Sequence, residues 1–467
     1  MDITPERISI GHGVSLSAPY TLKVINDENE LPAILLGDGC RIQPGLTIVA
    51  KHQVTLERNV LIDPHVHISD HVDMDVKLPT GAPFPNLGDS STEGEVHICE
   101  GAWIGAHAIV QGAVRIGRGS VVKPNSVVVR DVPDYCVVAG IPAEIVQLYE
   151  TSSVSWVPVT GDDHASELLA TRRRHPLLSI CLPTFNRAPH LEHCLQSIYD
   201  QIGDHELIEV IVSDNASTDA TAEIATRYAS RYSNMKYVRN EENIGGDPNI
   251  FRVMNLAQGT FVKLQGDDDF YVEGTLNALL HVLHSHSDCG IVQVFVRNGD
   301  GRIWTGTGMS AYLDATSIYA TFISSIVLRR EDLVKIKEPA LFLRSSFNQL
   351  YLQYAILEEN PKFCVMNSSM FTYGGGSSEG YNFGEIIFHS YQSILQHFIG
   401  RGLTMDDFLK EKKRTLFEYA LPWFDHIIRT KMEGNTDRFE DIYIDHYKDE
   451  PYYEEGLSII ASILKST

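Results

Sequence analysis

Three consecutive aspartates, Asp267, Asp268 and Asp269, follow a run of apolar and β-prone residues in the stretch AQGTFVKLQGDDDF. Carboxylates this close repel one another, so they need either solvation on a loop or a bound cation. Clustered carboxylate oxygens suit Mg²⁺ or Mn²⁺, and such an ion can hold a diphosphate at the same time. The stretch therefore indicates a site for a metal and a diphosphate.

Two further polar clusters also follow strand-like segments, PTFNR at residues 183–187 and SDNASTD at 213–219. From residue 177 onwards, short apolar strands alternate with segments of helical spacing, which is the βαβ pattern of a parallel sheet. Such folds bind ligands at the carboxyl ends of the strands, near the point where the strand order reverses. We therefore expect the three clusters to share one edge of the sheet.

The motifs PTFNR, EVIVSDNASTD, NEENIGGDPNI and AQGTFVKLQGDDDF make residues 177–275 similar to the family 2 glycosyltransferases with the GT-A fold. The similarity is greatest to the branch that builds bacterial surface polysaccharides. It implies an inverting, metal-dependent transfer of a sugar from a nucleotide-sugar donor to a glycan or lipid-linked glycan acceptor. By position, the implied nucleotide-sugar-binding residues are Pro183, Phe185, Arg187, Asp214, Asn243 and Asp267, and the implied ligands of Mn²⁺ or Mg²⁺ are Asp268 and Asp269.

The general base of this transfer is not identified by the resemblance. The family uses a carboxylate well downstream, often on a helix, and the matching stretch RSSFNQLYLQYAILEEN has Asn348 and Gln349 where an acid or histidine is expected. Glu358 and Glu359 are acidic, but they are equally typical of an exposed helix end. The sequence leaves the choice open.

A different pattern fills the first third of the chain, where an aliphatic residue returns at every sixth position. This period fits neither a helix nor a long strand, and it is typical of short strands stacked as the coils of a parallel β-helix. A β-sandwich with accidental spacing is the alternative. Residues 73–95, rich in Pro, Gly and acids, interrupt the pattern, and a loop of that length is usually functional or disordered. The repeating positions are Leu36, Ile42, Ile48, Val54, Val60, Val66, Val72, Ile98, Ile104, Val110, Ile116, Val122 and Val128.

Residues 36–146 resemble the hexapeptide-repeat acyltransferases, a left-handed parallel β-helix group that acetylates sugars and small acceptors. The match lies in HISDHVD at 67–73 and in residues 101–146, where D-V-P and A-G-I-P-A are the most specific elements. It implies that His71 deprotonates the acceptor, which then attacks the thioester of acetyl-CoA. His107 falls where the family has coenzyme-contacting residues, although a surface histidine is the simpler interpretation. The implied acetyl-CoA contacts are Ala106, Pro124, Val129 and Arg130.

These patterns predict a multidomain chain: a left-handed parallel β-helix, then an α/β GT-A (Rossmann-like) domain with a helical C-terminal region. We expect the β-helix at residues 1–150, a linker with about one helical turn at 151–175, and the GT-A domain at 176–380. Residues 381–467 are expected to form helices that pack on the transferase. Because the acyltransferase family forms its site between subunits, we also expect a homotrimer.

The composition of the chain narrows the possible partners, the redox state of its cysteines and its location. The chain has 467 residues, with 43% hydrophobic and 21% charged residues and a net charge of −23, which disfavours a nucleic-acid partner. Seven cysteines without a CxxC pair fit reduced thiols better than a disulfide framework or a zinc site. The sequence shows neither a signal peptide nor a membrane span, so we expect a cytoplasmic protein, either free or associated with the inner face of the membrane.

The leading interpretation is a bifunctional enzyme of glycan biosynthesis, which transfers a sugar from a nucleotide sugar and acetylates a sugar from acetyl-CoA. In the alternative, only the glycosyltransferase is active, and the β-helix is an inactive trimerisation scaffold. A carbohydrate-binding protein without catalysis is disfavoured, since a lectin has no evident need for a metal–diphosphate site.

Overall fold

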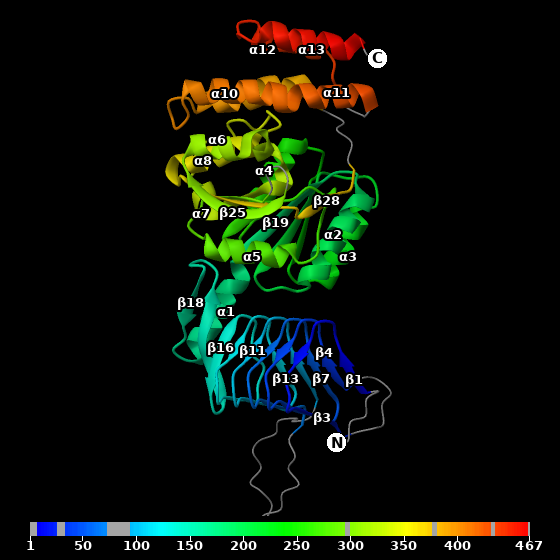
Figure 1. The fold of residues 1–467 in the computed structure, drawn as a ribbon, viewed down its shortest axis with the longest axis vertical. Helices are drawn as coiled ribbons and strands as arrows, with labels where there is room; N and C mark the ends of the chain where they lie inside the picture. Colours follow the sequence, from blue (N-terminus) through cyan, green and yellow to red (C-terminus); the bar gives the residue numbers. More distant parts are fainter. Residues whose placement is uncertain are drawn as a thin grey trace, which may run out of the picture. The chain divides into compact units, whose positions relative to one another are not determined.

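The computed structural model describes residues 7–25, 33–71, 94–294, 299–375, 381–430 and 435–465 (Figure 1). The chain divides into two compact units, residues 1–172 and 173–467. Each unit has a hydrophobic core of its own.

The first unit is built from three parallel sheets whose strands stack coil upon coil. The first sheet contains β1 (Ile8–Ile10), β4 (Ile34–Leu36), β7 (Gln53–Leu56), β10 (Glu95–Ile98) and β13 (Val114–Ile116). The second contains β2 (Ser15–Leu16), β5 (Arg41–Ile42), β8 (Leu61–Ile62), β11 (Trp103–Ile104), β14 (Val121–Val122) and β16 (Cys136–Gly140). The third contains β3 (Thr21–Val24), β6 (Thr47–Ala50), β9 (His67–Ser69), β12 (Ile109–Gln111) and β15 (Val127–Val128).

The six-residue pattern forms the core of this β-helix, as predicted. Each described residue of the pattern is at most 2% exposed, and Val72 lies outside the described residues. Equivalent residues pair between coils, such as Val96 with Val114. Full burial of an aliphatic side chain contributes about 1.5–3 kcal/mol, so the stacked ladder is the main source of stability of this unit.

The coils turn at corners where the backbone takes positive φ. At one corner these residues are Gly45, His65, His107 and Asn125, with φ of 89°, 63°, 58° and 62°. The backbone N–H of each of the last three donates to a carbonyl of the corner before it. The rings of His65 and His107 stack at 5.0 Å, so His107 contributes to the packing of this corner.

The first unit ends in elements that leave the coil pattern. β17 (Ala143–Glu150) pairs antiparallel with β16, and β18 (Ser155–Pro158) pairs antiparallel with β17. The segment expected to be a linker, 151–175, therefore contributes β18 and the 13-residue helix α1 (Asp162–Arg174), which is longer than the single turn expected. Leu168 and Leu169 of α1 pack against the core of the β-helix.

The second unit contains an eight-stranded mixed sheet in the order β21-β20-β19-β22-β26-β24-β27-β25. The first four of these strands are parallel and coincide with the four strands expected from the sequence. The second unit also contains a separate two-stranded antiparallel sheet, formed by β23 (Asp269–Tyr271) and β28 (Phe371–Tyr373). The eight strands are β19 (Leu178–Thr184), β20 (Ile208–Asp214), β21 (Met235–Arg239), β22 (Phe261–Leu264), β24 (Ile291–Gln293), β25 (Asp300–Thr307), β26 (Ile326–Arg329) and β27 (Lys362–Ser368).

Helices cover both faces of this sheet. Figure 1 shows α4, α6 and α8 on one face and α5 on the other, and α5 and α3 both contact α2. The helices are α2 (Ala188–Ile202), α3 (Thr221–Arg231), α4 (Gly246–Leu256), α5 (Thr275–Ser285), α6 (Met309–Thr316), α7 (Arg330–Leu333) and α8 (Asn348–Glu359).

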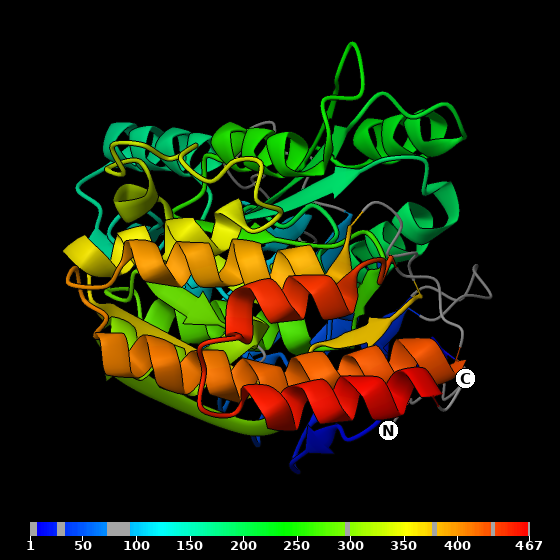
Figure 2. The ribbon, with the colours of Figure 1, turned by 90° about the horizontal axis from the view of Figure 1, so that it is seen from above.

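The C-terminal region is helical and shares the core formed by α4, α6 and α8. Figure 2 shows its long helices lying side by side across this face. The fold class expected from the sequence is thus confirmed. None of the helices within the described ranges is long and apolar enough to span a bilayer. The elements are a π-helical segment (Glu385–Tyr391), α9 (Gln392–His397), α10 (Met405–Thr415), a second π-helical segment (Leu416–Ala420), α11 (Leu421–Thr430), α12 (Phe439–Tyr447) and α13 (Tyr453–Lys465).

Candidate active sites

The three polar clusters of the second unit follow adjacent parallel strands. β19 lies between β20 and β22, so the strand order reverses here, and Thr184 at the end of β19 pairs with Asp214 at the end of β20. Cys181 of β19 pairs with Leu264, which ends β22 just before the aspartates. The structure therefore brings the three clusters to one edge of the sheet, at a topological switch point.

Asp267 is held by the first of these clusters. Its carboxylate accepts hydrogen bonds from the Thr184 hydroxyl at 2.7 Å and from Arg187 Nη1 at 3.0 Å. The same nitrogen of Arg187 donates to Asp268 at 2.9 Å. Burial raises the pKa of Asp267, and its side chain is only 6% exposed, against 18% for Asp268. Of these two carboxylates, Asp268 is the one more open to a ligand.

Asp269 is fixed from the other side. Its carboxylate accepts a hydrogen bond from the Ser324 hydroxyl, and Ser324 in turn accepts from the backbone N–H of Gly266. Burial raises the pKa of Asp269 to about 6, and the neighbouring Asp268 acts in the same direction. A carboxylate in this position is therefore stabilised by any cation bound next to it.

A buried lysine, Lys263, holds the backbone next to the three aspartates. Lys263 donates to the carbonyl oxygens of Leu264 and Ser324, at 2.9 and 2.8 Å, and to Gln265 Oε1 at 2.8 Å. Its burial lowers the pKa of the amine to about 7. Sequence reasoning missed Lys263, because a lysine inside the strand FVKL has no local feature that distinguishes it from a surface residue.

The residues implied for the nucleotide are more varied. Asp214 is fully buried, and its carboxylate accepts from the Ser217 N–H at 2.8 Å and the Tyr237 hydroxyl at 2.9 Å. Asn243 accepts from the Asn215 side chain at 2.7 Å. Phe185 is 40% exposed, so one face of its ring is free to stack on a planar base. Pro183 is half-buried beside Thr184 on β19.

Asp247 begins the first turn of α4 and reaches a distant part of the chain. Its Oδ2 accepts a hydrogen bond from the Ser346 N–H at 2.6 Å, two residues before α8. Burial raises the pKa of Asp247 to about 6. The charges of Asp247 and Arg187 both act on the Tyr381 phenol, whose pKa is raised by burial, so this tyrosine lies near both groups.

The glutamates left open by the sequence lie at the opposite end of α8. Glu358 is bound by Arg401 through two hydrogen bonds of 2.7 and 2.9 Å, and Glu359 is exposed at the last turn. At the N-terminal end, Asn348 and Gln349 are both only 3% exposed, and the side-chain oxygen of each has no hydrogen-bond partner among the described residues. These two acceptors are available to a donor from a ligand.

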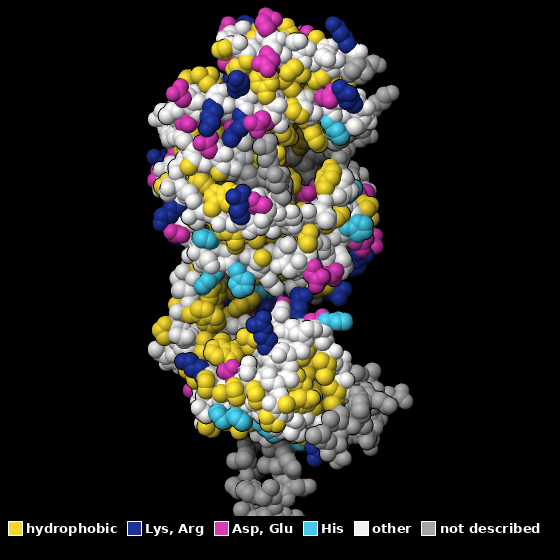
Figure 3. Space-filling model, in the orientation of Figure 1, with side chains coloured by type: hydrophobic (Ala, Val, Ile, Leu, Met, Phe, Trp, Pro, Cys, Tyr) yellow, Lys and Arg dark blue, Asp and Glu magenta, His cyan; other side chains and the backbone are white. Residues whose placement is uncertain are grey.

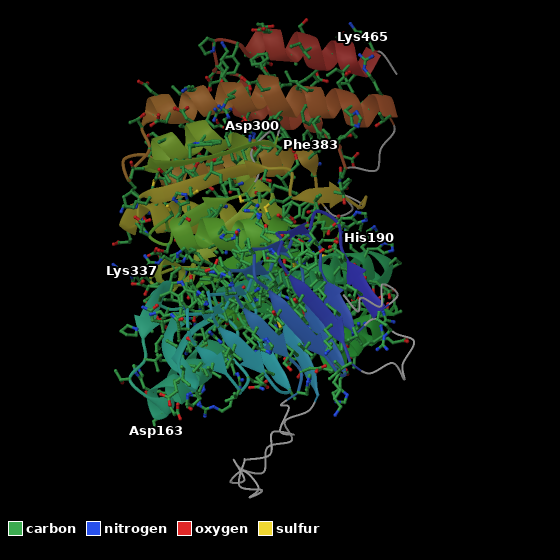
Figure 4. The ribbon with its side chains drawn as sticks, turned by 60° about the horizontal axis from the view of Figure 1, so that its bottom comes forward. Asp163, His190, Asp300, Lys337, Phe383 and Lys465 are labelled. Atoms are coloured by element: carbon green, nitrogen blue, oxygen red, sulfur yellow. The ribbon has the colours of Figure 1, made fainter. Side chains whose placement is uncertain are left out.

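The N-terminal part of α2 contacts the segment that follows β28. His190, labelled in Figure 4, lies one turn after Arg187, and its Nε2 is 2.6 Å from the carbonyl oxygen of Gly375. Residues 376–380 follow directly and lie outside the described residues. This contact joins α2 to the segment after β28.

In the first unit, His71 follows β9 and is fixed by its neighbours. Its Nδ1 lies 2.9 Å from Asp70 Oδ1, and its carbonyl oxygen accepts from the Ser69 hydroxyl at 2.8 Å. Asp70 is fully buried and also accepts from the backbone N–H groups of Lys51 and His52. This pair orients the ring and leaves Nε2 as the proton acceptor. Asp70 was not predicted, although its place directly before His71 in HISDH is a usable signal.

The residues implied for acetyl-CoA occupy two corners of the coil. Val129 and Arg130, both exposed, follow β15 as His71 follows β9, and β12 lies between these strands. A spacing of about 4.8 Å per strand separates the two positions by about 10 Å along the stack. Ala106 and Pro124 lie together at the corner before β12 and β15. The candidate surface thus extends across one face of the β-helix, and residues 73–93 of the interrupting segment lie outside the described residues.

Charges on the second unit are mixed in sign. On the face shown in Figure 3, Lys and Arg side chains alternate with Asp and Glu side chains over this unit. Many are paired, such as Arg401 with Glu358 and Lys410 with Asp314. A groove for nucleic acid would instead need a continuous basic stripe.

Two family models match the chain. The model described as glycosyl transferase family 2 matches residues 179–351, and the model described as bacterial transferase hexapeptide (six repeats) matches residues 95–130. The matched ranges contain the two candidate sites, apart from His71. Both predicted resemblances are confirmed, each over its own part of the chain.

Similar proteins exist for each part. Abequosyltransferase RfbV of Salmonella typhimurium is 25% identical over 301 residues, which cover 57% of this chain and 87% of the relative. Galactoside O-acetyltransferase of Escherichia coli K12 is 34% identical over 107 residues, which cover 22% of this chain and 47% of the relative. The crystal structure of residues 1–349 of S. aureus TarS in complex with UDP-GlcNAc superposes with a TM-score of 0.41 and 17% identity, covering 62% of this chain and 81% of TarS.

Proposed function

We propose that the chain is a bifunctional enzyme of glycan biosynthesis, because it joins a hexapeptide-repeat, acetyltransferase-like region to a family 2 glycosyltransferase domain. The second unit transfers a sugar from a nucleotide-sugar donor to a glycan or lipid-linked glycan, with inversion at the anomeric carbon. The first unit acetylates a sugar from acetyl-CoA. The observation that carries the proposal is the position of Asp267, Asp268 and Asp269 at the carboxyl ends of the parallel strands, where Arg187 binds the first two.

The donor's diphosphate would lie against Asp268 and Asp269, with Mn²⁺ or Mg²⁺ between them. The donor set fits such an ion, because it consists of carboxylate oxygens and because burial makes the ionised form of Asp269 costly without a neighbouring cation. The ion supplies charge stabilisation to the leaving diphosphate. Arg187 bridges Asp267 and Asp268 and offsets their mutual repulsion, while Phe185, which is 40% exposed, offers its ring to the nucleobase.

We assign Asp247 as the group that takes the proton of the acceptor hydroxyl. It is tied to Ser346, at the end of α8 where the related enzymes carry their carboxylate and where this chain has Asn348 and Gln349. A carboxyl whose pKa is raised to about 6 is ionised at neutral pH and still basic enough to accept a proton. The acceptor oxygen bonds to the anomeric carbon as the bond from that carbon to the diphosphate breaks.

In the first unit, Nε2 of His71 would accept the proton of a sugar hydroxyl or amine. The deprotonated group attacks the thioester carbonyl of acetyl-CoA, and the carbon–sulfur bond breaks, so that the coenzyme leaves as its thiol. Asp70, which is buried behind His71, stabilises the imidazolium formed in this step. Arg130 supplies a positive charge suited to the phosphates of the coenzyme.

The second candidate is an active glycosyltransferase on an inactive β-helix scaffold. Pro124 favours it, because proline offers no backbone N–H at a position where the coenzyme is expected. Either version is compatible with a homotrimer, a cytoplasmic location and association with the inner face of the membrane, and we propose the trimer because the acetyltransferase surface would be completed by a neighbouring copy.

Thermal stabilisation of the full chain tests the proposal directly, because a ligand that binds only the folded state raises its melting temperature. The chain is screened against UDP-, CDP-, GDP- and dTDP-sugars with Mn²⁺ and, separately, against acetyl-CoA. Stabilisation by at least one nucleotide sugar that depends on Mn²⁺ is expected. A second unit that no nucleotide sugar stabilises would contradict the glycosyltransferase assignment.

A further inference from the structure

Three side chains that can bind a metal meet on the outside of the β-helix. Glu57 follows β7, and His97 and Cys99 belong to the neighbouring coil, in and just after β10. β10 pairs in register with β7, with Ile98 opposite Leu56, so Cys99 comes to lie beside Glu57. One donor atom of each of the three residues lies within 4.8 Å of the other two.

The donor set is sulfur, imidazole nitrogen and carboxylate oxygen, which is the chemistry of a zinc site. Zinc binds such atoms at about 2.0–2.3 Å in a tetrahedral arrangement, so adjacent donors lie about 3.3–3.8 Å apart. All three donor atoms already lie within 4.8 Å of one another, and His97 Nε2 is 2.6 Å from Glu57 Oε1, so side-chain rotation can bring them to this spacing. A thiolate and a carboxylate also balance the charge of a divalent ion.

The surroundings hold the ligands in place. Glu57 uses its second oxygen to accept the backbone N–H of Glu100 at 2.8 Å, which fixes the carboxylate plane. Two basic residues lie near the cluster and also interact with other carboxylates, since Arg115 donates to Asp134 at 2.9 Å and Arg118 lies 3.7 Å from the Glu100 carboxylate. Hydrogen bonds that orient a ligand side chain in this way are typical of metal sites.

Two of the three ligands are open to solvent ions. His97 Nε2 lies 2.6 Å from Glu57 Oε1. The side chains of His97 and Glu57 are 42% and 35% exposed. A divalent ion can therefore reach these two side chains from solvent, and it would bind the neutral imidazole of His97.

We propose that Glu57, His97 and Cys99 bind a zinc ion that ties two adjacent coils of the β-helix together, with a water molecule as the fourth ligand. The site is independent of both transfer reactions. It stabilises the stack because its ligands come from two coils, and a metal bound only in the folded state adds its binding free energy to folding.

Cobalt titration of the full chain, after treatment with a chelator, tests this site. Cobalt reports a thiolate ligand through a charge-transfer absorption that carboxylate sites do not give, so the aspartates of the second unit do not interfere. We expect one equivalent of cobalt with this absorption, its displacement by zinc, and a higher melting temperature with zinc. In Cys99→Ser the absorption should disappear.

Cys136→Ser is the matched control, because Cys136 is also buried in the β-helix and belongs to no such cluster within the described ranges. It should retain the cobalt absorption. If Cys99→Ser fails to fold, His97→Asn serves instead, since that side chain is partly exposed, and the stabilisation by zinc should be lost. A spectrum without the thiolate band, or a band that persists in Cys99→Ser, overturns the proposal.

Discussion

Asp247 accepts a hydrogen bond from the backbone N–H of Ser346 at 2.6 Å, across 99 residues of chain. The contact fixes a carboxylate near the N-terminal end of α8, where two buried amides have oxygens without a partner in the part of the chain that the structure describes. The first turn of α8 contains no acidic residue, and α4 supplies a carboxylate there instead.

Replacing Asp247 by Asn should lower kcat for sugar transfer by about 10²–10⁴-fold, because the proton acceptor is lost. The Asn side-chain oxygen can still accept from Ser346, so the fold and the donor affinity should be retained. The wild-type rate should fall as the pH drops below about 6, where Asp247 is protonated, and the residual rate of the variant should lack this step. Steady-state kinetics from acidic to neutral pH provide the measurement. A variant with the wild-type rate would exclude this role.

Asp268→Asn should abolish the manganese-dependent stabilisation by the nucleotide sugar. Saturation at 100 times the dissociation constant is worth about 2.7 kcal/mol, which a melting curve resolves easily. The ligand-free variant should keep its melting temperature, because the side chain is partly exposed and its removal relieves repulsion with its neighbours. Asp314→Asn, an exposed carboxylate paired with Lys410, is the control and should respond to donor and manganese like the wild type.

His71→Ala should remove acetyl-CoA turnover, measured as release of the free thiol, and should leave sugar transfer unchanged. His12→Ala is the matched control, since His12 is an exposed histidine of the same β-helix and lies in the first coil, between β1 and β2. It should keep turnover. A wild-type chain that releases no thiol with any sugar acceptor would favour the scaffold function of the β-helix.

Lys263→Met should destabilise the second unit by about 1–3 kcal/mol, because it leaves buried acceptors unsatisfied. The pKa of this lysine is about 7 in the folded chain, below the ordinary 10.5, so the unfolded chain binds more protons between these values. Wild-type stability should therefore rise as the pH increases from about 7 towards 8.5, and this contribution should vanish in the variant. Urea unfolding at the two pH values gives the comparison, and an identical pH dependence in both proteins would contradict the assignment.

Much of the fold could be predicted because its signals are local and repeated. Val54, Val60 and Val66 recur at a fixed interval, and each is buried for the same geometric reason. The strands ending at Thr184 and Asp214 could be placed because a βαβ pattern constrains their direction and neighbours. Strands β24 to β27 were not predicted, since their pairings, antiparallel except between β24 and β27, join segments far apart in sequence.

The residues of the candidate sites also fall into those that local sequence predicts and those that it does not. Asp268 was predicted because three adjacent carboxylates are unusual in any sequence. Asp247 and Lys263 were not, because their importance comes from Ser346 and Ser324, which lie far along the chain. The ligands of the proposed zinc site could not be recognised from cysteine spacing, because Glu57 and Cys99 become neighbours only when two coils stack.

The pairing of the coils on either side of residues 72–93 has a consequence for evolution. β11 pairs with β8 before this segment and with β14 after it, and the inward-facing residues stay in step throughout. These pairs do not depend on the length of the sequence between Ser69 and Glu95. Descendants of one ancestral gene can therefore gain or lose residues in this part of the sequence while the paired strands on either side are inherited unchanged.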